Sequence, residues 1–379
     1  MKKILFISHD ASRSGAPLVL LNLIKWIKSN HTNIEIDVLT LKAGPLENAF
    51  KKNCSNFFVY EAKNKPEKFK NLLLNKIKTK IRIKNVRTSK EALFYKNIVN
   101  NNYNLIYANT IVTVPIAVQL KSLIPNVKLL VHIHELNAII KTFVPNFSNY
   151  VSNLDFIIAA SSQVKRNLIK NWNVTESIIE IIYPFAVTTV PKIINQSKNK
   201  SFRIGASGLA YWRKGDDIFL QVASLVKKKL PQVAIEFIWV GANNIDKIML
   251  EEDIQKLQLS KTVNFIGEQK NPFDLYNSFD VFLLTSREDP FPLVCIEVAQ
   301  LEKPIICFDK ASGSSEIIKN GGGFVVPYLD IEEMANKVIY YYNNQHKLKE
   351  HGKKNKKLFA PYTSAKICPQ IYNQILKII

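Results

Sequence analysis

The sequence has few cysteines, and their spacing forms neither a metal site nor a disulfide framework. The four cysteines are widely separated, with no Cys-x-x-Cys pair and no neighbouring histidines: Cys54, Cys295, Cys307 and Cys368. Structural zinc sites need closely spaced ligands, and disulfide scaffolds need dense cysteines in a short secreted chain. We therefore expect reduced, mostly buried thiols, as in cytosolic proteins.

The sequence also lacks an apolar run long enough to cross a bilayer as a helix, which takes about 20 residues. Its first ten residues, MKKILFISHD, reach charged side chains too soon for a signal peptide. We expect a cytoplasmic protein without a spanning segment, which at most lies peripherally on the inner face of the cytoplasmic membrane.

Acidic residues are scarce: 31 Asp and Glu stand against 52 Lys and Arg, a formal net charge of +21 that attracts polyanions in general. Residues 63–90 concentrate this charge, with eleven Lys or Arg and one acid. Apolar residues recur there every four positions, at Phe69, Leu73, Ile77 and Ile81. A helix with this stripe between lysines is typical of an anionic membrane surface. The alternatives are a solvated basic surface, with the stripe packed on its own domain, and, least favoured, nucleic acid.

Short apolar runs rich in isoleucine and valine alternate with helix-like segments along the chain. The predicted strands are KKILFIS, IEIDVLT, NFFVY, NLIYAN, VKLLVHI and DFIIAAS, and then FRIGAS, AIEFIWVG, VNFIG, DVFLLTS, PIICFD and GFVVP. Such alternation predicts parallel sheets covered by helices on both faces. A polar segment at 188–201 separates the two sets of strands, and 379 residues exceed what one core usually organises.

The predicted fold class is therefore α/β, with two tandem Rossmann-like doubly wound domains that face a cleft. We assign the first domain to residues 1–190, a linker to 191–201 and the second domain to 202–361. A C-terminal helix in 362–379 is expected to pack back toward the first domain.

Ligands of open parallel sheets bind beyond the carboxyl ends of the strands, so the loops there are candidate sites. The loop after the first strand contains Ser14, Gly15 and Ala16 and opens a helix, whose free N–H groups and dipole favour an anion. An ordinary turn is the alternative. In the second domain, IGASGLAYWRKGDD places Gly208 before Arg213 and Lys214, a pair suited to a diphosphate or simply to solvent.

A third loop, in SREDPFPLVCIE, places Asp289 before a helix and Glu297 inside it. With Pro292 at the first helical position, Glu297 lies about one and a half turns in, and helical side chains lean toward the N-terminus. Both carboxylates can then reach one elongated ligand, and a vicinal diol suits the second. Capping, or pairing of Glu297 with a lysine, is the alternative.

These motifs resemble the family 4 (group 1) glycosyltransferases of the GT-B fold. The resemblance spans nearly the whole chain and is strongest in 204–327, where RKGDDIFLQVA, VNFIGEQ, FDVFLLTSREDPFPLVCIE and GGGFVVP occur in the family's order. The family's late motif usually has Glu followed by Gly-Phe-Gly, whereas this sequence has Asp289 followed by Pro-Phe-Pro.

The resemblance implies roles in the second domain, which would bind the donor. Glu297 would hold the ribose hydroxyls, and Asp289, with Glu288 as competitor, would contact the transferred sugar. Backbone N–H groups in the segment Phe291, Pro292 and Leu293 would face that sugar or its phosphate.

The diphosphate would be neutralised by Arg213 and Lys214, because an arginine common in the family is replaced near Gly208. From the acceptor-binding first domain, Gly15 and Ala16 would approach the diphosphate. His134 matches a histidine beside the donor sugar, with His132 and Glu135 as lesser candidates.

The implied activity is that of a retaining glycosyltransferase which moves a sugar from a nucleoside diphosphate to a glycan or lipid-linked acceptor in bacterial lipopolysaccharide or capsule synthesis. No cofactor or metal is expected, since Asp-x-Asp is absent. Expected partners are the donor, the acceptor and an anionic membrane through 63–90, but no nucleic acid. The alternatives are a nucleotide-sugar epimerase and a non-catalytic binding protein for sugar nucleotides or polyanions.

Overall fold

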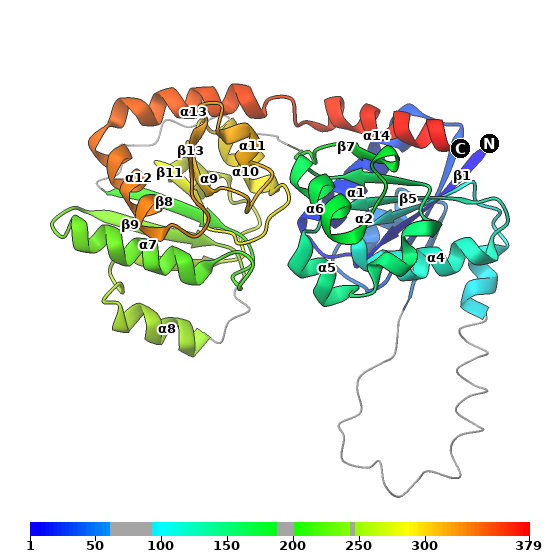
Figure 1. The fold of residues 1–379 in the computed structure, drawn as a ribbon, viewed down its shortest axis with the longest axis horizontal. Helices are drawn as coiled ribbons and strands as arrows, with labels where there is room; N and C mark the ends of the chain where they lie inside the picture. The colour runs from blue at the N-terminus through cyan, green and yellow to red at the C-terminus, as the bar shows by residue number, and fades with distance from the viewer. Residues whose placement is uncertain (61–92, 188–200, 243–246) are drawn as a thin grey trace, which may run out of the picture.

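The computed structural model describes residues 1–60, 93–187, 201–242 and 247–379. Within them the chain forms two α/β domains (Figure 1), each built on a parallel sheet, so the predicted fold class is confirmed. The basic segment 63–90 and most of the linker 191–201 lie outside the described residues. In the part that is described, no helix has the length and hydropathy needed to span a bilayer.

The first sheet has seven described strands in the order β3-β2-β1-β4-β5-β6-β7, with all neighbours parallel. They are β1 (Lys2–Ser8), β2 (Ile34–Thr40), β3 (Asn56–Val59), β4 (Leu105–Asn109), β5 (Lys128–Ile133), β6 (Phe156–Ala159) and β7 (Ile179–Ile181). Six coincide with predicted runs, because strands buried on both faces read as continuous apolar sequence. The short β7 was not predicted.

Helices cover both faces of this sheet. They are α1 (Gly15–Asn30), α2 (Glu47–Lys51), residues 93–99, η1 (Ile111–Thr113), α4 (Val114–Leu123), α5 (Asn137–Phe143), η2 (Phe147–Asn153), α6 (Ser162–Trp172) and η3 (Glu176–Ile178). Successive β1 side chains serve opposite cores: Leu5 and Ile7 pack with α4 and α6, whereas Ile4 and Phe6 pack with α1.

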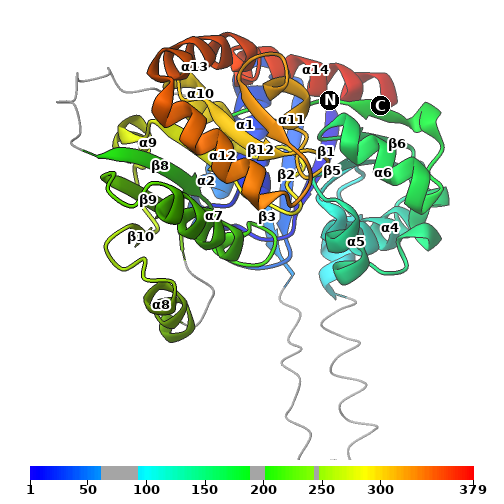
Figure 2. The same ribbon diagram turned by 60° about the vertical axis from the view of Figure 1, so that its left-hand side comes forward.

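The second sheet has the order β10-β9-β8-β11-β12-β13 among the described strands, again parallel. Its strands are β8 (Phe202–Ser207), β9 (Ile235–Val240), β10 (Val263–Gly267), β11 (Val281–Leu284), β12 (Ile305–Phe308) and β13 (Gly323–Val326). Its helices are α7 (Asp216–Lys229), α8 (Lys247–Lys256), α9 (Phe273–Ser278), α10 (Leu293–Gln300), α11 (Ser315–Ile318), α12 (Ile331–Asn343) and α13 (Gln345–Phe359). α7 and α12 pack side by side on one face (Figure 2).

The last helix, α14 (Ser364–Ile378), leaves the second domain and lies over the first (Figure 1). Ile367, Ile371 and Ile375 enter the core that α1 shares with the sheet, and the Tyr372 ring stacks on His31 with centroids 3.8 Å apart. A bridge between Ala186 and Thr363 joins the two chain segments that run between the domains.

Strand order reverses direction between β1 and β4 in the first sheet and between β8 and β11 in the second. Loops that leave neighbouring strands on opposite sides of such a point diverge and open a crevice at the carboxyl ends. The loops after β1, β4, β8 and β11 therefore define where the two domains can share a ligand.

Candidate functional site

The beginnings of α1 and α10 face each other across the domain boundary. A Cβ placed on Gly15 would lie 3.8 Å from Cδ1 of Leu293, so the predicted first loop and the predicted third loop are brought together. We use the word cleft for the crevice at the carboxyl ends of the two sheets. We call Arg213, Lys214, Asp289 and Glu297 the second-domain wall of this cleft. The first-domain wall, defined below, stands on the loops after β1, β4 and β5.

Asp289 forms the centre of the second-domain wall. Its carboxylate, only 7% exposed, accepts hydrogen bonds from Lys214 Nζ, from Arg213 NH1 at 3.3 Å and from Ser286 Oγ at 3.2 Å. Burial acts to raise the pKa of Asp289, but the charges of Lys214 and Arg213 outweigh it and hold that pKa below its ordinary value. The ionised carboxylate thus fixes both cations in place and leaves them one net positive charge.

Two glycines allow this arrangement. Gly208 has φ 141°, and a Cβ there would lie 3.0 Å from Cε of Lys214, so the lysine side chain passes directly over it. Gly215 has φ 70°, and its Cβ would lie 2.2 Å from the carbonyl oxygen of Thr285. Gly215 occupies the N-cap of α7, so Asp216 is the first helical residue.

Glu297 is the unpaired acid of the second-domain wall. It lies four residues after Leu293 in α10 and therefore on the helix face that meets Gly15. Its partly buried carboxylate forms no hydrogen bond or ion pair with any residue that the structure describes, and burial raises its pKa to about 7. Neither alternative interpretation, a cap or a lysine pair, is realised among those residues.

The segment before α10 differs in one detail from its prediction. Pro292 has φ −68° and ψ 127° and stands at the N-cap, so the helix begins at Leu293. The side chain of Phe291 packs among Tyr183, Phe359 and Tyr362 and is buried. Only the backbone of Phe291 is therefore available to a ligand, and Pro292 has no N–H to offer.

Glu288 and Asp289 are adjacent but serve different domains. Oε1 of Glu288 accepts a hydrogen bond from the backbone N–H of Ala138 in α5, at 3.0 Å, across the domain boundary. Its Oε2 is buried without a hydrogen-bond partner in the described structure. Arg213 NH1 also donates to the Glu288 carbonyl oxygen at 3.0 Å, which ties the loop after β8 to the loop after β11.

The first-domain wall consists of Gly15, Asn109, His134 and Glu135. Asn109 joins two predicted positions, because its Oδ1 lies 3.0 Å from Nε2 of His134 and its Nδ2 donates to the carbonyl of Ala16 at 3.0 Å. Sequence reasoning missed Asn109; the available signal was a polar residue at the carboxyl end of an otherwise apolar strand. Burial, reinforced by His9, lowers the pKa of His134 to about 3, so its imidazole is neutral.

His132 and Glu135 flank His134 in different ways. The His132 ring is buried, its centroid lies 3.9 Å from that of His134, and its Nδ1 is 2.7 Å from the Tyr107 hydroxyl. Oε2 of Glu135 accepts the backbone N–H groups of Ile111 and His134, each at 3.0 Å. Burial raises the pKa of Glu135 to about 7 despite these bonds and the charge of Arg213 from the opposite wall.

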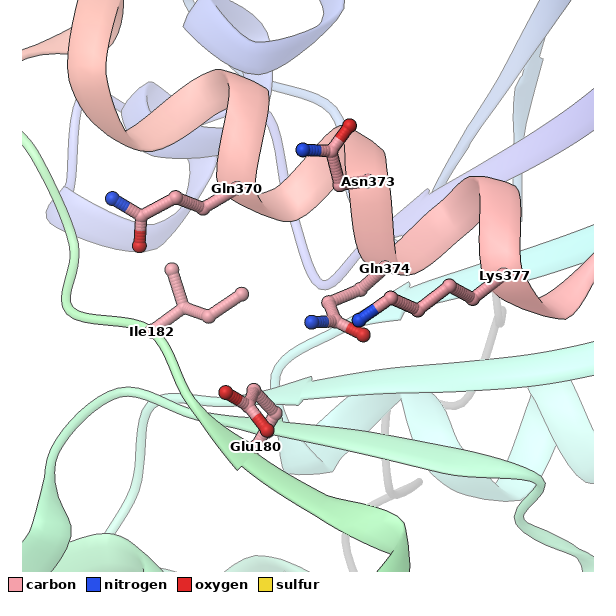
Figure 3. A pocket seen from close by; sticks show the side chains of 6 residues that line it. All are labelled: Glu180, Ile182, Gln370, Asn373, Gln374 and Lys377. Atoms are coloured by element: carbon pink, nitrogen blue, oxygen red, sulfur yellow. The ribbon is translucent and has the colours of Figure 1, made fainter.

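Two further features concern metals and cavities. Over residues 1–60, 93–187, 201–242 and 247–379, no group of three or more His, Cys, Asp or Glu side chains converges as a metal site would require. A cavity of about 460 Å³ lies between β7 and α14 (Figure 3), and it shares no residue with the cleft. Half of its six lining residues carry carboxamides, namely Gln370, Asn373 and Gln374.

Comparison with known proteins finds a family model, curated relatives and solved structures that this chain resembles. Residues 191–358, somewhat under half of the chain, match the family model of the glycosyl transferases group 1. An uncharacterized glycosyltransferase of Haemophilus influenzae is 25% identical over 194 residues, which cover 51% of this chain and 53% of that protein. The amylovoran biosynthesis glycosyltransferase AmsD of Erwinia amylovora is 32% identical over 135 residues, 35% of this chain and 37% of the relative. The chain thus spans about half, or less, of the length of these relatives.

Among solved structures, Alr3699/HepE of Anabaena, in complex with UDP-glucose, superimposes with a TM-score of 0.80. The superposition covers 100% of both chains at 19% sequence identity. At this identity the likeness establishes the fold, which is the two-domain GT-B arrangement, and the family match concerns the second domain.

Proposed function

We propose that this protein is a retaining glycosyltransferase of family 4, which transfers a sugar from a nucleoside diphosphate to a glycan or lipid-linked acceptor in surface polysaccharide synthesis. The observation that carries this proposal is the second-domain wall, where the anchored cations Arg213 and Lys214 follow β8 and the unpaired Glu297 lies in the helix after the neighbouring strand β11. The family match over 191–358 supports it, and the description of AmsD supports the polysaccharide pathway.

The donor would be held by complementary chemistry at its two ends. The Glu297 carboxylate accepts hydrogen bonds from the two ribose hydroxyls, which satisfies an acid that no protein group satisfies among the described residues. Arg213 and Lys214 bind the diphosphate oxygens, and the free N–H groups at the start of α1, around Gly15 and Ala16, approach them from the first domain.

The chemical step breaks the bond between the anomeric carbon and the β-phosphate oxygen, and the electron pair stays on the phosphate. Arg213 and Lys214 stabilise this charge where it develops. Asp289, whose carboxylate is engaged by both cations, positions them. The acceptor hydroxyl then bonds to the same face of the sugar and gives its proton to the departing phosphate oxygen, which retains the anomeric configuration without a metal.

A screen of sugar nucleotides tests this proposal. Thermal stability and transfer to acceptor extracts are measured with UDP-, GDP-, ADP- and dTDP-sugars, in EDTA and then in Mg²⁺. UDP-sugars come first because HepE is described with UDP-glucose. We expect one nucleotide class to stabilise the wild type in EDTA, and Glu297→Gln to lose that shift while the exposed control Glu332→Gln keeps it. No stabilisation by any donor, or an equal shift in Glu297→Gln, would contradict the proposal.

A nucleotide-sugar epimerase is the second candidate, because His132 and Glu135 surround His134 with further groups able to move protons. Incubation of the donor without acceptor separates the two functions. A glycosyltransferase releases at most a little free sugar, whereas an epimerase converts the sugar while it is still attached to the nucleotide, as NMR of the product shows.

The membrane prediction concerns residues 63–90, and we propose that this segment holds the enzyme at an anionic bilayer. Each surface-proximal cation contributes roughly 1 kcal/mol to such binding. We expect cosedimentation with vesicles containing phosphatidylglycerol and none with neutral vesicles. Deletion of 63–90 should abolish it, and persistent binding after the deletion would place the contact elsewhere.

A further inference from the structure

A large groove runs along one flank of the domain boundary, with a volume of about 1190 Å³. One wall is α6 of the first domain, and the other is α11 with the residues that follow it and Tyr328. Leu136 and Glu288 line its inner end. Leu136 directly follows the first-domain wall at Glu135, and Glu288 directly precedes Asp289, so this flank groove adjoins the candidate site.

The α6 wall presents a single polar face. Gln163, Arg166 and Lys170 recur at the three- and four-residue spacing that aligns side chains along a helix, and all three line the groove. The opposite face of α6, at Val164 and Leu168, is buried in the first-domain core. The helix therefore turns its cations toward the groove because its apolar face is already occupied.

On the second-domain side of the groove, Arg287 is paired with Asp217 at 2.6 Å and Lys310 lies 4.0 Å from Asp309, whereas Lys319 has no acidic partner among the described residues. Altogether five basic and three acidic side chains line the groove. The Glu316 carboxylate forms an ion pair with the Arg166 guanidinium at 3.2 Å and accepts a hydrogen bond from the Tyr183 hydroxyl at 2.6 Å. The ammonium groups of Lys170 and Lys319, one on each wall, form no ion pair or hydrogen bond with any described residue, and both residues are exposed.

Aromatic rings stand at the same groove. Tyr328 lines it and is 46% exposed. Trp212, 54% exposed, is not a lining residue, but the guanidinium of Arg287, which is one, lies over its ring at 5.5 Å from the centroid. Exposed rings of this kind bury the apolar faces of a ligand while their polar atoms stay wet. Cations together with exposed rings suit a chain of sugar or polyol units that carries negative charge.

We infer that the flank groove binds the acceptor and that this acceptor is an acidic glycan chain, whose phosphate or carboxylate groups lie between Lys170 and Lys319. This inference rests on the proposed function and specifies its acceptor. The groove volume exceeds what a single small ligand fills, so several units fit and their end reaches the cleft beside Glu288. A neutral chain would leave both lysines uncompensated.

Binding of defined oligomers to the full-length protein tests the inference. The probes are fluorescent oligo(glycerol phosphate), oligogalacturonate and a neutral maltooligosaccharide of equal length, without donor. We expect at least one anionic probe to bind at least tenfold more tightly than the neutral one, and the two anionic arms to show whether phosphate or carboxylate is recognised. Lys170→Gln/Lys319→Gln should reduce that affinity roughly tenfold, equivalent to about 1.4 kcal/mol.

The matched control is Lys25→Gln/Lys366→Gln, which removes two exposed lysines from α1 and α14. It should leave binding of the anionic probe unchanged. Equal binding of neutral and anionic probes, or equal losses in the two double variants, would overturn the inference, because the charge of the whole protein would then explain the binding. Donor stabilisation is measured in parallel: its retention in Lys170→Gln/Lys319→Gln supports a separate acceptor subsite, and its absence in the wild type would overturn the proposed function instead.

Discussion

The two walls of the cleft are built from different chemistry. On the second-domain wall, Arg213 and Lys214 are charged and held by the ionised Asp289. On the first-domain wall, His134 is neutral, and Asn109 connects it to the start of α1. The difference teaches that the second-domain wall carries fixed positive charge, whereas the His134 side of the cleft carries an uncharged imidazole and a carboxamide.

Removal of a cation should have the largest effect. Lys214→Met leaves the developing charge on the leaving group without one of its two stabilising cations, and we expect the transfer rate to fall roughly 100-fold to 1000-fold. The rate is measured at saturating donor, with Lys261→Met, an exposed lysine of the same domain, as control. A fall below tenfold would mean that the second-domain wall does not act on the leaving group.

Replacement of Asp289, which holds Arg213 and Lys214 in place, should mainly affect stability. Asp289→Asn breaks a buried ion pair, and we expect a loss of roughly 3 kcal/mol of unfolding free energy at pH 7. Because the folded-state pKa of Asp289 is depressed, its contribution is complete above the ordinary value and is lost as the pH falls through the lower folded-state value. Denaturant titrations from pH 7 downward should therefore show wild type and Asp289→Asn converging in acid. A constant difference across that range would contradict the ion-pair explanation.

Glu297, the unpaired acid, should change the stability of the protein with pH in the opposite direction. Burial raises the pKa of Glu297 to about 7, so the folded protein favours the protonated side chain. The protein is therefore most stable below the ordinary pKa of glutamate and loses stability as the pH rises through about 7. Glu297→Gln should therefore be more stable than the wild type at pH 8, by roughly 1 to 3 kcal/mol, and indistinguishable from it at pH 4. Thermal unfolding at both pH values checks this, and Glu332→Gln should show no such crossover.

The smallest effect concerns the first-domain wall. His134→Asn should lower the transfer rate roughly tenfold while the nucleotide still stabilises the protein, because the groups assigned to the diphosphate and ribose are intact. With a pKa of about 3, the His134 ring should also show no protonation in an NMR titration from pH 8 to pH 5. Protonation near pH 6 would mean that His134 is charged at that pH, and it would contradict the proposed difference between a charged and an uncharged wall.

Local sequence was sufficient for most of the strands, and the exceptions have physical causes. Runs such as KKILFIS become β1 because both faces of the strand are buried, which requires apolar residues at every position. The missed β7 has three residues, of which only Ile179 is buried, so its sequence carries little of that signal. Pro292 was misplaced by one residue because its fixed φ fits the N-cap as well as the first turn.

The candidate site was predictable as a set of positions but not as a set of contacts. Each predicted loop follows a strand, and parallel strands bring the loops of one sheet to one edge, so the proximity of the loops after β8 and β11 was predictable. The meeting of Gly15 with Leu293 depends on how the two domains face each other. The hydrogen-bond partners of Asp289 and Glu288 could not be predicted, because they come from distant segments. They include Lys214 for Asp289, and the backbone of Ala138 in the other domain for Glu288. The roles assigned to these residues remain predictions.

The sequence by itself determined two parallel-sheet domains, the loops that carry chemistry and the excess of positive charge, because periodicity, turn residues and composition are local properties. Only the tertiary structure decided that Asp289 anchors two cations, that Glu297 stays unpaired and that Lys170 and Lys319 face one groove. Each of these depends on the distance between side chains far apart along the chain, and packing of the two domains sets that distance.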